Sequence, residues 1–281
     1  MIGLVCPLAS GSLGNALLVA SAKTRILVDM GISGRRLAAA KKAAGAAADG
    51  IDAILLTHTH SDHFGAAAAD FCLAHRTAVY SAAENFAFLA AESTGFRDLA
   101  GAGLARPIDG AAIEIGDIRV EAFDVPHDAP GRCLGFRLTV GGAGGAGGAG
   151  GRRGWSAAIA TDLGHMPEGC LGWFADADVV VLESNHDPEM LRESGRPRDL
   201  IERIAGPKGH LSNAATAEAV AEIVGRSHSG RVQQVILAHL SRHCNTPKLA
   251  LAAQGHLACR HGGAIRIRAA TQYAVGPKVV L

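Results

Sequence analysis

The chain has 281 residues, 48% hydrophobic and only 4% aromatic, so its core must be built mainly from Ala, Val, Leu and Ile. The formal net charge is +1 with histidines neutral, which excludes a whole-molecule field that would steer a polyanion. Any positive charge that binds one must therefore be local. The 13 histidines are the unusual feature of the composition, and they fall at the ends of predicted strands rather than in a run.

Six cysteines are scattered without a C-x-x-C pair, which predicts free thiols in a reducing compartment rather than disulfides or a structural zinc site. The first 20 residues lack a basic segment and are interrupted by Ser, Gly and Asn, so we expect no secretory signal. No stretch reaches 18 apolar residues, so we expect no transmembrane helix and no membrane partner. These features predict a cytoplasmic protein.

Short apolar runs bounded by Gly, Asp and Asn predict β-strands along the chain. The predicted strands are Leu17–Ala20, Arg25–Asp29, Ala53–Thr57, Thr77–Tyr80, Ile118–Phe123, Leu134–Val140, Ser156–Thr161, Val179–Glu183 and Val232–His239. Ala-rich segments with helical spacing predict helices at Arg35–Ala44, Phe64–His75, Glu84–Glu92, Asn213–Arg226 and Pro247–Arg260. Ser212 or Asn213 is expected to cap the fourth helix. The mixture predicts an α/β protein in which helices cover sheets.

One segment is of low complexity: residues 141–151 read GGAGGAGGAGG and residues 152–154 read RRG. Glycine at this density cannot fix a backbone, so the sequence predicts a flexible Gly-rich loop over residues 141–154. The loop lies between two predicted strands, which indicates a hairpin tip rather than a linker. We see no other boundary and no internal repeat, so we expect a single domain over residues 1–281.

The densest group of chemically active residues is THTHSDH at residues 57–63, directly after a predicted strand. His58 and His60 are two positions apart, so at a strand end their side chains point the same way and can share one metal ion. Asp62 and His63 follow where the chain turns into a helix, and can bind a second metal. A carboxylate beside imidazoles suits Zn²⁺, Mn²⁺ or Fe²⁺.

Three more candidate ligands follow predicted strands: His127, Asp162 and His239. Each would be ambiguous alone, because single His and Asp residues are common at strand ends. Together with residues 57–63, they predict a site for two metals.

The pattern H-x-H-x-D-H, followed by a single His, a single Asp and a last His at strand ends, resembles the metallo-β-lactamase superfamily over nearly the whole chain. The resemblance implies an αββα sandwich with a two-metal site between its sheets. Seven ligands are implied: His58, His60 and His127 for the first metal, Asp62, His63 and His239 for the second, and Asp162 bridging both. Asp29 matches an early strand-end Asp that orients the ligands from behind.

Four other segments resemble the YycJ/WalJ branch of this superfamily, which is grouped with phosphodiesterases and exonucleases. They are LASGSLGN at residues 8–15, LESNHD at 182–187, GHLSN at 209–213 and HLS at 239–241. GHLSN also resembles the G-H-x-[ST] motif of tRNA 3′-processing endonucleases, in which the His assists departure of the leaving group. One departure is Cys244 before Asn245, where the branch commonly has two Asn.

The implied reaction is attack on a phosphodiester by a hydroxide that bridges two metals about 3.5–4 Å apart. Asp62 is expected to orient this hydroxide, and His210 to donate a proton to the leaving oxygen. The alternative for His210 is a cap of the following helix. The candidate phosphate donors, which could equally be turn residues, are Ser10, Asn15, Asn185 and Asn245. His186 is expected to lie behind the ligands.

The sequence therefore predicts a metal-dependent hydrolase of phosphodiester bonds, with a DNA exonuclease using two Zn²⁺ or Mn²⁺ ions favoured and Fe²⁺ possible. The alternatives are a thioesterase or cyclic-phosphate diesterase, a tRNA 3′-processing-like ribonuclease, and a regulatory protein without the chemistry. Too little chain lies between His127 and Asp162 for the tRNA-gripping arm, and only residues 240–281 follow His239, where thioester hydrolases carry an extra substrate-binding region. The complete ligand set argues against lost chemistry.

Overall fold

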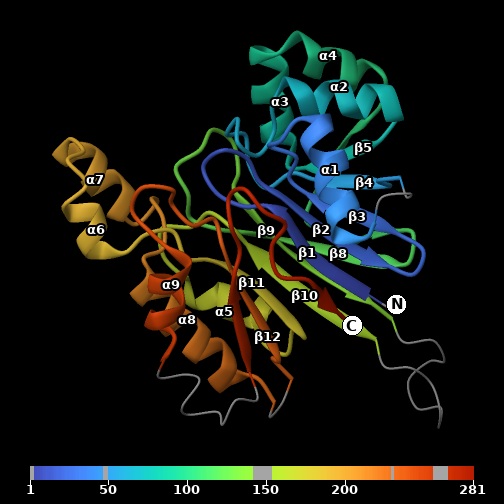
Figure 1. Ribbon diagram of the computed structural model, residues 1–281. Coiled ribbons are helices and arrows are strands. Elements are labelled where there is room, and N and C mark those ends of the chain that lie inside the picture. Colours follow the sequence, from blue (N-terminus) through green and yellow to red (C-terminus); the bar gives the residue numbers. More distant parts are fainter. Residues whose placement is uncertain (1–2, 47–49, 142–153, 229–230, 256–264) are drawn as a thin grey trace, which may run out of the picture.

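The computed structural model describes residues 3–46, 50–141, 154–228, 231–255 and 265–281, and within them two mixed sheets pack face to face (Figure 1). The first sheet has the order β14-β1-β2-β3-β4-β5-β6. Its strands are β1 (Gly3–Ala9), β2 (Ala16–Ser21), β3 (Arg25–Val28), β4 (Ala53–Leu55), β5 (Ala78–Ser81), β6 (Ala105–Pro107) and β14 (Val279–Val280). The second has the order β13-β12-β11-β10-β9-β8-β7. Its strands are β7 (Ile113–Ile115), β8 (Ile118–Asp124), β9 (Leu134–Val140), β10 (Trp155–Ala160), β11 (Val179–Glu183), β12 (Gln234–Ala238) and β13 (Arg266–Ala269).

Helices cover the outer face of each sheet, as Figure 1 shows. On the first sheet these are α1 (Gly34–Ala44), α2 (Ala66–His75), α3 (Ala83–Glu92) and α4 (Thr94–Gly101). On the second they are α5 (Glu168–Phe174), α8 (Asn213–Arg226) and α9 (Pro247–Ala253). The short helices α6 (Pro188–Arg192) and α7 (Arg198–Ala205) project from the body (Figure 1), and α7 has no buried residue. The αββα sandwich expected from the sequence is confirmed.

Three apolar cores hold the layers together, one between the sheets and one under each helical layer. In β3, Leu27 faces the helices, while Ile26 and Val28 face the other sheet. Strands covered on both faces must be apolar at every position, which explains the unbroken runs of Val, Ile, Leu and Ala. Small side chains allow these closely packed layers with few aromatic residues.

Strand direction brings the active residues to one edge. Strands β3 to β6 run parallel to one another, and so do β10 to β13. Asp29, Asp162 and His239 follow β3, β10 and β12 within two residues, and Glu183 ends β11. The carboxyl ends of parallel strands are where open α/β sheets place their sites.

Every strand and helix predicted from the sequence is present. The strand ends lie within two residues of the predicted ones, and the last helix ends at Ala253 before residues 256–264, which lie outside the described ranges. Ser212 is the cap of α8, with its Oγ accepting from Ala215 N. Val140 pairs with Trp155 across a hairpin, as expected, and residues 142–153 of the Gly-rich loop lie outside the described residues.

Several elements were missed: β1, the short strands β6, β7, β13 and β14, and helices α4 to α7. Among the helices of the described ranges, none has the length and apolar character needed to cross a membrane.

Candidate metal centre

The first group of metal-capable side chains consists of His58, His60 and His127, which offer ligand atoms within 4.8 Å of one another. Nε2 of His58 lies 3.1 Å from Nδ1 of His60. The His127 ring centroid is 5.0 Å from that of His58 and 5.3 Å from that of His60. Two ring nitrogens so close need a proton or a cation between them, because two lone pairs repel each other. The group therefore offers three imidazoles to one cation.

The second group consists of Asp62, His63 and His239. Asp62 Oδ2 lies 3.7 Å from Nε2 of His63 and 3.5 Å from Nε2 of His239. Both histidines are buried, whereas the Asp62 side chain is 25% exposed. Asp62 therefore lies on the solvent side, and the imidazoles lie deeper in the protein. The residues of the two groups together are called the cluster below.

Asp162 lies between the two groups. Its Oδ2 is 3.3 Å from Nε2 of His63, and its Oδ1 is 3.9 Å from Nε2 of His127. The side chain is only 3% exposed. One buried carboxylate thus faces both sets of imidazoles, which is the position a bridging ligand requires.

Hydrogen bonds from behind fix how three of the rings face the cluster. The Nδ1–H groups donate as follows: His63 to Asp29 Oδ2 (2.7 Å), His127 to Gly209 O (2.9 Å) and His239 to Glu183 Oε1 (3.2 Å). Since the acceptors are carboxylates or a carbonyl, Nδ1 must carry the proton and Nε2 the lone pair. This arrangement is typical of histidines that bind metals. Asp29 thus lies behind His63, on the side of the ring away from Nε2.

Unpartnered atoms show that the cluster fits divalent metal. Nε2 of His127, Nε2 of His239 and Oδ2 of Asp162 are buried without a hydrogen-bond partner among the described residues. Leaving such atoms unpaired costs about 1–3 kcal/mol each, and more for a charge. The two nitrogens belong to the two groups above, the carboxylate oxygen lies between them, and all three are atoms that can bind a metal. Divalent cations held by the two groups would satisfy them.

Carboxylates dominate the electrostatics of the second group. Burial alone would lower the pKa of His63, but Asp162 and Asp29 raise it to about 9. Burial would also lower the pKa of His239, but Asp162, Asp62 and Glu183 together raise it well above its usual value. Burial and neighbouring imidazoles instead hold the pKa of His58 well below its usual value. The cluster thus carries excess negative charge on one side, where a cation is stabilised.

The backbone is bent where the ligands sit. Asp29 and His239 have φ of 62° and 52°, in the left-handed region that non-glycine residues rarely occupy. Gly31 packs so closely on the loop of the second group that a Cβ there would lie 1.6 Å from Asp62 O. Asn15 N donates to the same carbonyl at 2.8 Å. These constraints fix the chain direction at the ends of β3 and β12.

Glu183 is the functional residue that the sequence analysis missed, although it lies inside the LESNHD segment. It is fully buried, and four donors converge on it: Nδ1 of His210 (2.7 Å) and of His239 (3.2 Å) on Oε1, and N of Leu163 (2.9 Å) and of Leu211 (3.1 Å) on Oε2. A carboxylate that ends a buried strand was the available signal. Glu183 joins a metal-capable group to the GHLSN segment.

His210 stands beside the cluster, with its ring 4.9 Å from that of His127 and 5.5 Å from that of His239. Burial would lower its pKa, but Glu183 raises it. The side chain is 22% exposed, and among the described residues its ring is hydrogen-bonded through Nδ1 alone. The alternative of a helix cap is wrong, because Ser212 caps α8.

The four predicted phosphate donors have partners inside the protein. Ser10 Oγ accepts from His239 N at 2.7 Å, and Asn185 Nδ2 donates to His239 O at 3.0 Å. Asn15 Nδ2 lies 3.1 Å from Nε2 of His63. All three touch second-group residues, so their observed contacts position the ligands.

Asn245 is different. Its amide donates to the carbonyls of Ser184 and Asn185 and exchanges hydrogen bonds with the Asn213 side chain. Its Oδ1 also accepts from Thr246 N. These hydrogen bonds use the donors and the acceptor of the buried amide, so none is left to bind a phosphate. The observed role of Asn245 is therefore structural.

His186 is also buried, and its ring Nδ1 has no hydrogen-bond partner among the described residues. Its backbone bridges Ser212 and accepts from Asn213 N, so it supports the segment that carries His210 rather than touching a ligand.

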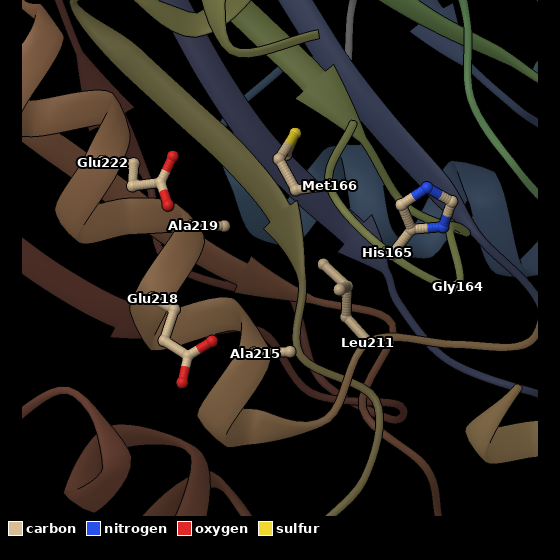
Figure 2. A pocket seen from close by; sticks show the side chains of 8 residues that line it. All are labelled: Gly164, His165, Met166, Leu211, Ala215, Glu218, Ala219 and Glu222. Carbon is tan, nitrogen blue, oxygen red and sulfur yellow. The ribbon is translucent and has the colours of Figure 1, made fainter. Parts of the chain in front are cut away.

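Two of the pockets formed by the described residues are large enough to admit part of a substrate. One, of about 170 Å³, is lined by His60, His127 and His210 together with Asp128, Leu200, Arg203, Ile204, Lys208 and Gly209. The other, of about 220 Å³, lies where Glu218 and Glu222 of α8 face Met166, His165 and Leu211 (Figure 2). No residue of the two metal-capable groups lines the second pocket. The first pocket therefore opens onto His60 and His127 of the candidate metal centre.

Comparison with known proteins agrees with this geometry. Residues 24–239 match the model of the beta-lactamase superfamily domain. The fold is similar to that of YhfI from Bacillus subtilis, a metallo-β-lactamase fold protein, with a TM-score of 0.67 at 13% identity over 99% of both chains. It is also similar to Zn²⁺-bound PqqB from Methylobacterium extorquens, with a TM-score of 0.66 at 14% identity over 99% and 100%. Fold and site define a metal-dependent hydrolase of the metallo-β-lactamase superfamily.

Curated relatives narrow the family. The chain is 31% identical over 248 residues to exodeoxyribonuclease WalJ of Streptococcus pneumoniae serotype 2, which covers 86% of this chain and 83% of that protein. It is 32% identical over 253 residues to exodeoxyribonuclease YycJ of Bacillus anthracis, covering 86% and 84%. The chain therefore belongs to the WalJ/YycJ family of metallo-β-lactamase-like proteins.

Proposed function

We propose that this protein is a DNA exonuclease that hydrolyses phosphodiester bonds with two divalent metal ions, Zn²⁺ or Mn²⁺. The observation that carries the proposal is the buried cluster of imidazoles and carboxylates with His210 beside it, held by Glu183. The similarity to two exodeoxyribonucleases over 86% of the chain supports DNA as the substrate. The five cysteines of the described ranges are free and buried, which supports a reducing, cytoplasmic setting.

In this proposal the ligands are those implied by the sequence: His58, His60 and His127 hold one metal, Asp62, His63 and His239 the other, and Asp162 bridges them. When bound, the metals supply positive charge at phosphorus and make a nucleophile available at neutral pH. Asp62, at the mouth of the cluster, accepts a hydrogen bond from the attacking water and orients it.

His210 donates a proton to the leaving oxygen. Glu183 holds its Nδ1, which leaves Nε2 as the nitrogen that reaches the substrate. The ring lines the pocket beside the cluster, so the leaving group and the proton donor share one space. A phosphodiester needs this help because an alkoxide leaves poorly without a proton.

Pocket size supports a polymer over an enclosed small molecule. The pocket beside the ligands holds about 170 Å³, below the roughly 300–1,000 Å³ of pockets that enclose small ligands. A phosphate group can enter it while the rest of a strand lies across the surface. A thioester with a bulky carrier would find no enclosing site there.

Replacing His210 by Ala should lower kcat on DNA by about 10²-fold, the lower end of the range for a general acid. Hydrolysis of bis(4-nitrophenyl) phosphate should stay within a few-fold of the wild-type rate, because nitrophenolate leaves without a proton. Steady-state kinetics on both substrates check this. A matched control is His243→Ala, an exposed histidine outside the cluster. Equal losses on both substrates would show that His210 acts on the metals or the fold instead.

The function itself is tested with metal-reconstituted protein on labelled single-stranded and duplex DNA, RNA, bis(4-nitrophenyl) phosphate and a glutathione thioester. We expect stepwise shortening of DNA from one end, and no such shortening by Asp162→Asn protein prepared in parallel. Cleavage of the thioester without cleavage of DNA would overturn the proposal. If the protein cleaves RNA in preference to DNA, it is a ribonuclease and the proposed DNA substrate is wrong.

A further inference from the structure

Lys208 is a cation at the mouth of the site that the residue roles above do not use. It directly precedes the GHLSN segment and lines the 170 Å³ pocket with His60, His127 and His210. The residue is exposed. Within the described ranges, no hydrogen bond or ion pair engages its ammonium group. A charged side chain thus lines the pocket that borders His60 and His127.

The other charges of the pocket do not neutralise Lys208. Asp128 is the only carboxylate among the lining residues, and its Oδ2 accepts from Arg203 Nε at 2.8 Å. Arg203 and Asp128 therefore compensate each other, and Lys208 leaves the pocket with one uncompensated positive charge. The net charge of the protein is only +1, so a polyanion must be bound by local positive charge. Lys208 supplies such a charge beside the ligands.

The backbone holds Lys208 in a defined place. Lys208 O accepts from Asp128 N at 2.9 Å, and Pro207 O accepts from His165 Nδ1 at 2.9 Å. A Cβ at Gly209 would lie 2.1 Å from Ile204 O, so only glycine lets the chain pass this close to α7. The lysine is therefore tied to the same rigid segment as His210 rather than to a free loop.

We propose that Lys208 binds a phosphate of the DNA strand next to the one that is cleaved. This inference rests on the proposed function, because it assigns a second phosphate contact to the same strand. Lys208 lines the same pocket as His60 and His127, so a strand whose scissile phosphate lies at these ligands has its neighbouring phosphate within the pocket that carries the lysine. The contact positions the polymer and discriminates it from substrates with a single phosphate.

Lys208→Gln should lower kcat/KM on single-stranded DNA about fivefold through KM, with kcat nearly unchanged. Hydrolysis of bis(4-nitrophenyl) phosphate, which has no second phosphate, should not change. The slope of log(kcat/KM) against log[salt] on DNA should become shallower by about 0.7, the value for one phosphate contact of a single strand. Lys208→Arg should retain most of the wild-type KM and slope.

Lys23→Gln is the matched control, because Lys23 is exposed in the turn between β2 and β3, at the opposite end of the strands from the ligands. If Lys208→Gln matches wild type and Lys23→Gln in KM and salt slope on DNA, the inference is wrong while the proposed function stands. An equal loss on bis(4-nitrophenyl) phosphate would also overturn it, since that loss indicates damage to the metal centre. Failure of the wild-type protein to cleave DNA would overturn the proposed function itself.

Discussion

Asp162→Asn is expected to lower kcat/KM on DNA by about 10³-fold or more. The amide has the shape of the carboxylate but no charge, and Asp162 is the one carboxylate that faces both groups of imidazoles. Metal ions contribute several kcal/mol to such reactions, and each 1.36 kcal/mol is a factor of ten in rate. The measurement is steady-state hydrolysis of DNA and of bis(4-nitrophenyl) phosphate. Both should fall together, because the metals serve both.

Metal content and thermal unfolding separate this effect from misfolding. Wild-type protein should lose about 5 °C in Tm on chelation, the stabilisation expected for metal at 100 times its Kd. Asp162→Asn should bind less metal per chain by elemental analysis and show a smaller shift. Asp109→Asn, at an exposed position between β6 and β7, should behave as wild type. Full activity and full metal content in Asp162→Asn would refute the proposed bridge.

The parts of the fold that the sequence predicted are those with strong local signals. Strand β11 is buried throughout and begins with an unbroken apolar run, β9 alternates buried residues with the half-buried Arg137 and Thr139, and the ends of both were correct to the residue. Helices α6 and α7 are only five and eight residues long and have few buried side chains or none, so neither gives a long periodic apolar pattern. Strand β14 is only two residues long and exists because β1 offers it a free edge.

The cluster was predictable because its ligands follow strands, and parallel strands end at one edge. The partners behind the ligands were harder to find. Glu183 was missed because only the pairing of β11 between β10 and β12 brings it to His210 and His239. Asn245 was assigned to phosphate because its type fits, whereas its amide is filled by Ser184, Asn185 and Asn213. The roles of Glu183 and Asn245 both depend on contacts between segments far apart in the sequence. A single sequence does not show which distant segments are in contact.

Glu183→Gln is expected to lower kcat on DNA by about 10³-fold and to destabilise the fold. Four N–H donors converge on the carboxylate, but a glutamine has one oxygen, so its amide must face at least one donor. Breaking such a buried charged network costs about 3–5 kcal/mol. The loss of rate combines two effects: about 10² from a misoriented His210, and about tenfold from a weakened His239, since groups behind a metal ligand contribute 10–100-fold.

The ratio of losses on two substrates distinguishes orientation from mere instability. Bis(4-nitrophenyl) phosphate does not need the proton of His210, so Glu183→Gln should lower its hydrolysis only about tenfold, through His239. Below the lowered Tm, equal losses on both substrates would mean that Glu183 acts only through the metals or the fold. The control is Glu114→Gln, because the Glu114 side chain is 62% exposed and forms a surface ion pair with Arg119 at 3.8 Å. Glu183 is thus the residue through which the proton donor and the metal ligand His239 are held as one unit, and the two losses should not be additive when His210→Ala is combined with Glu183→Gln.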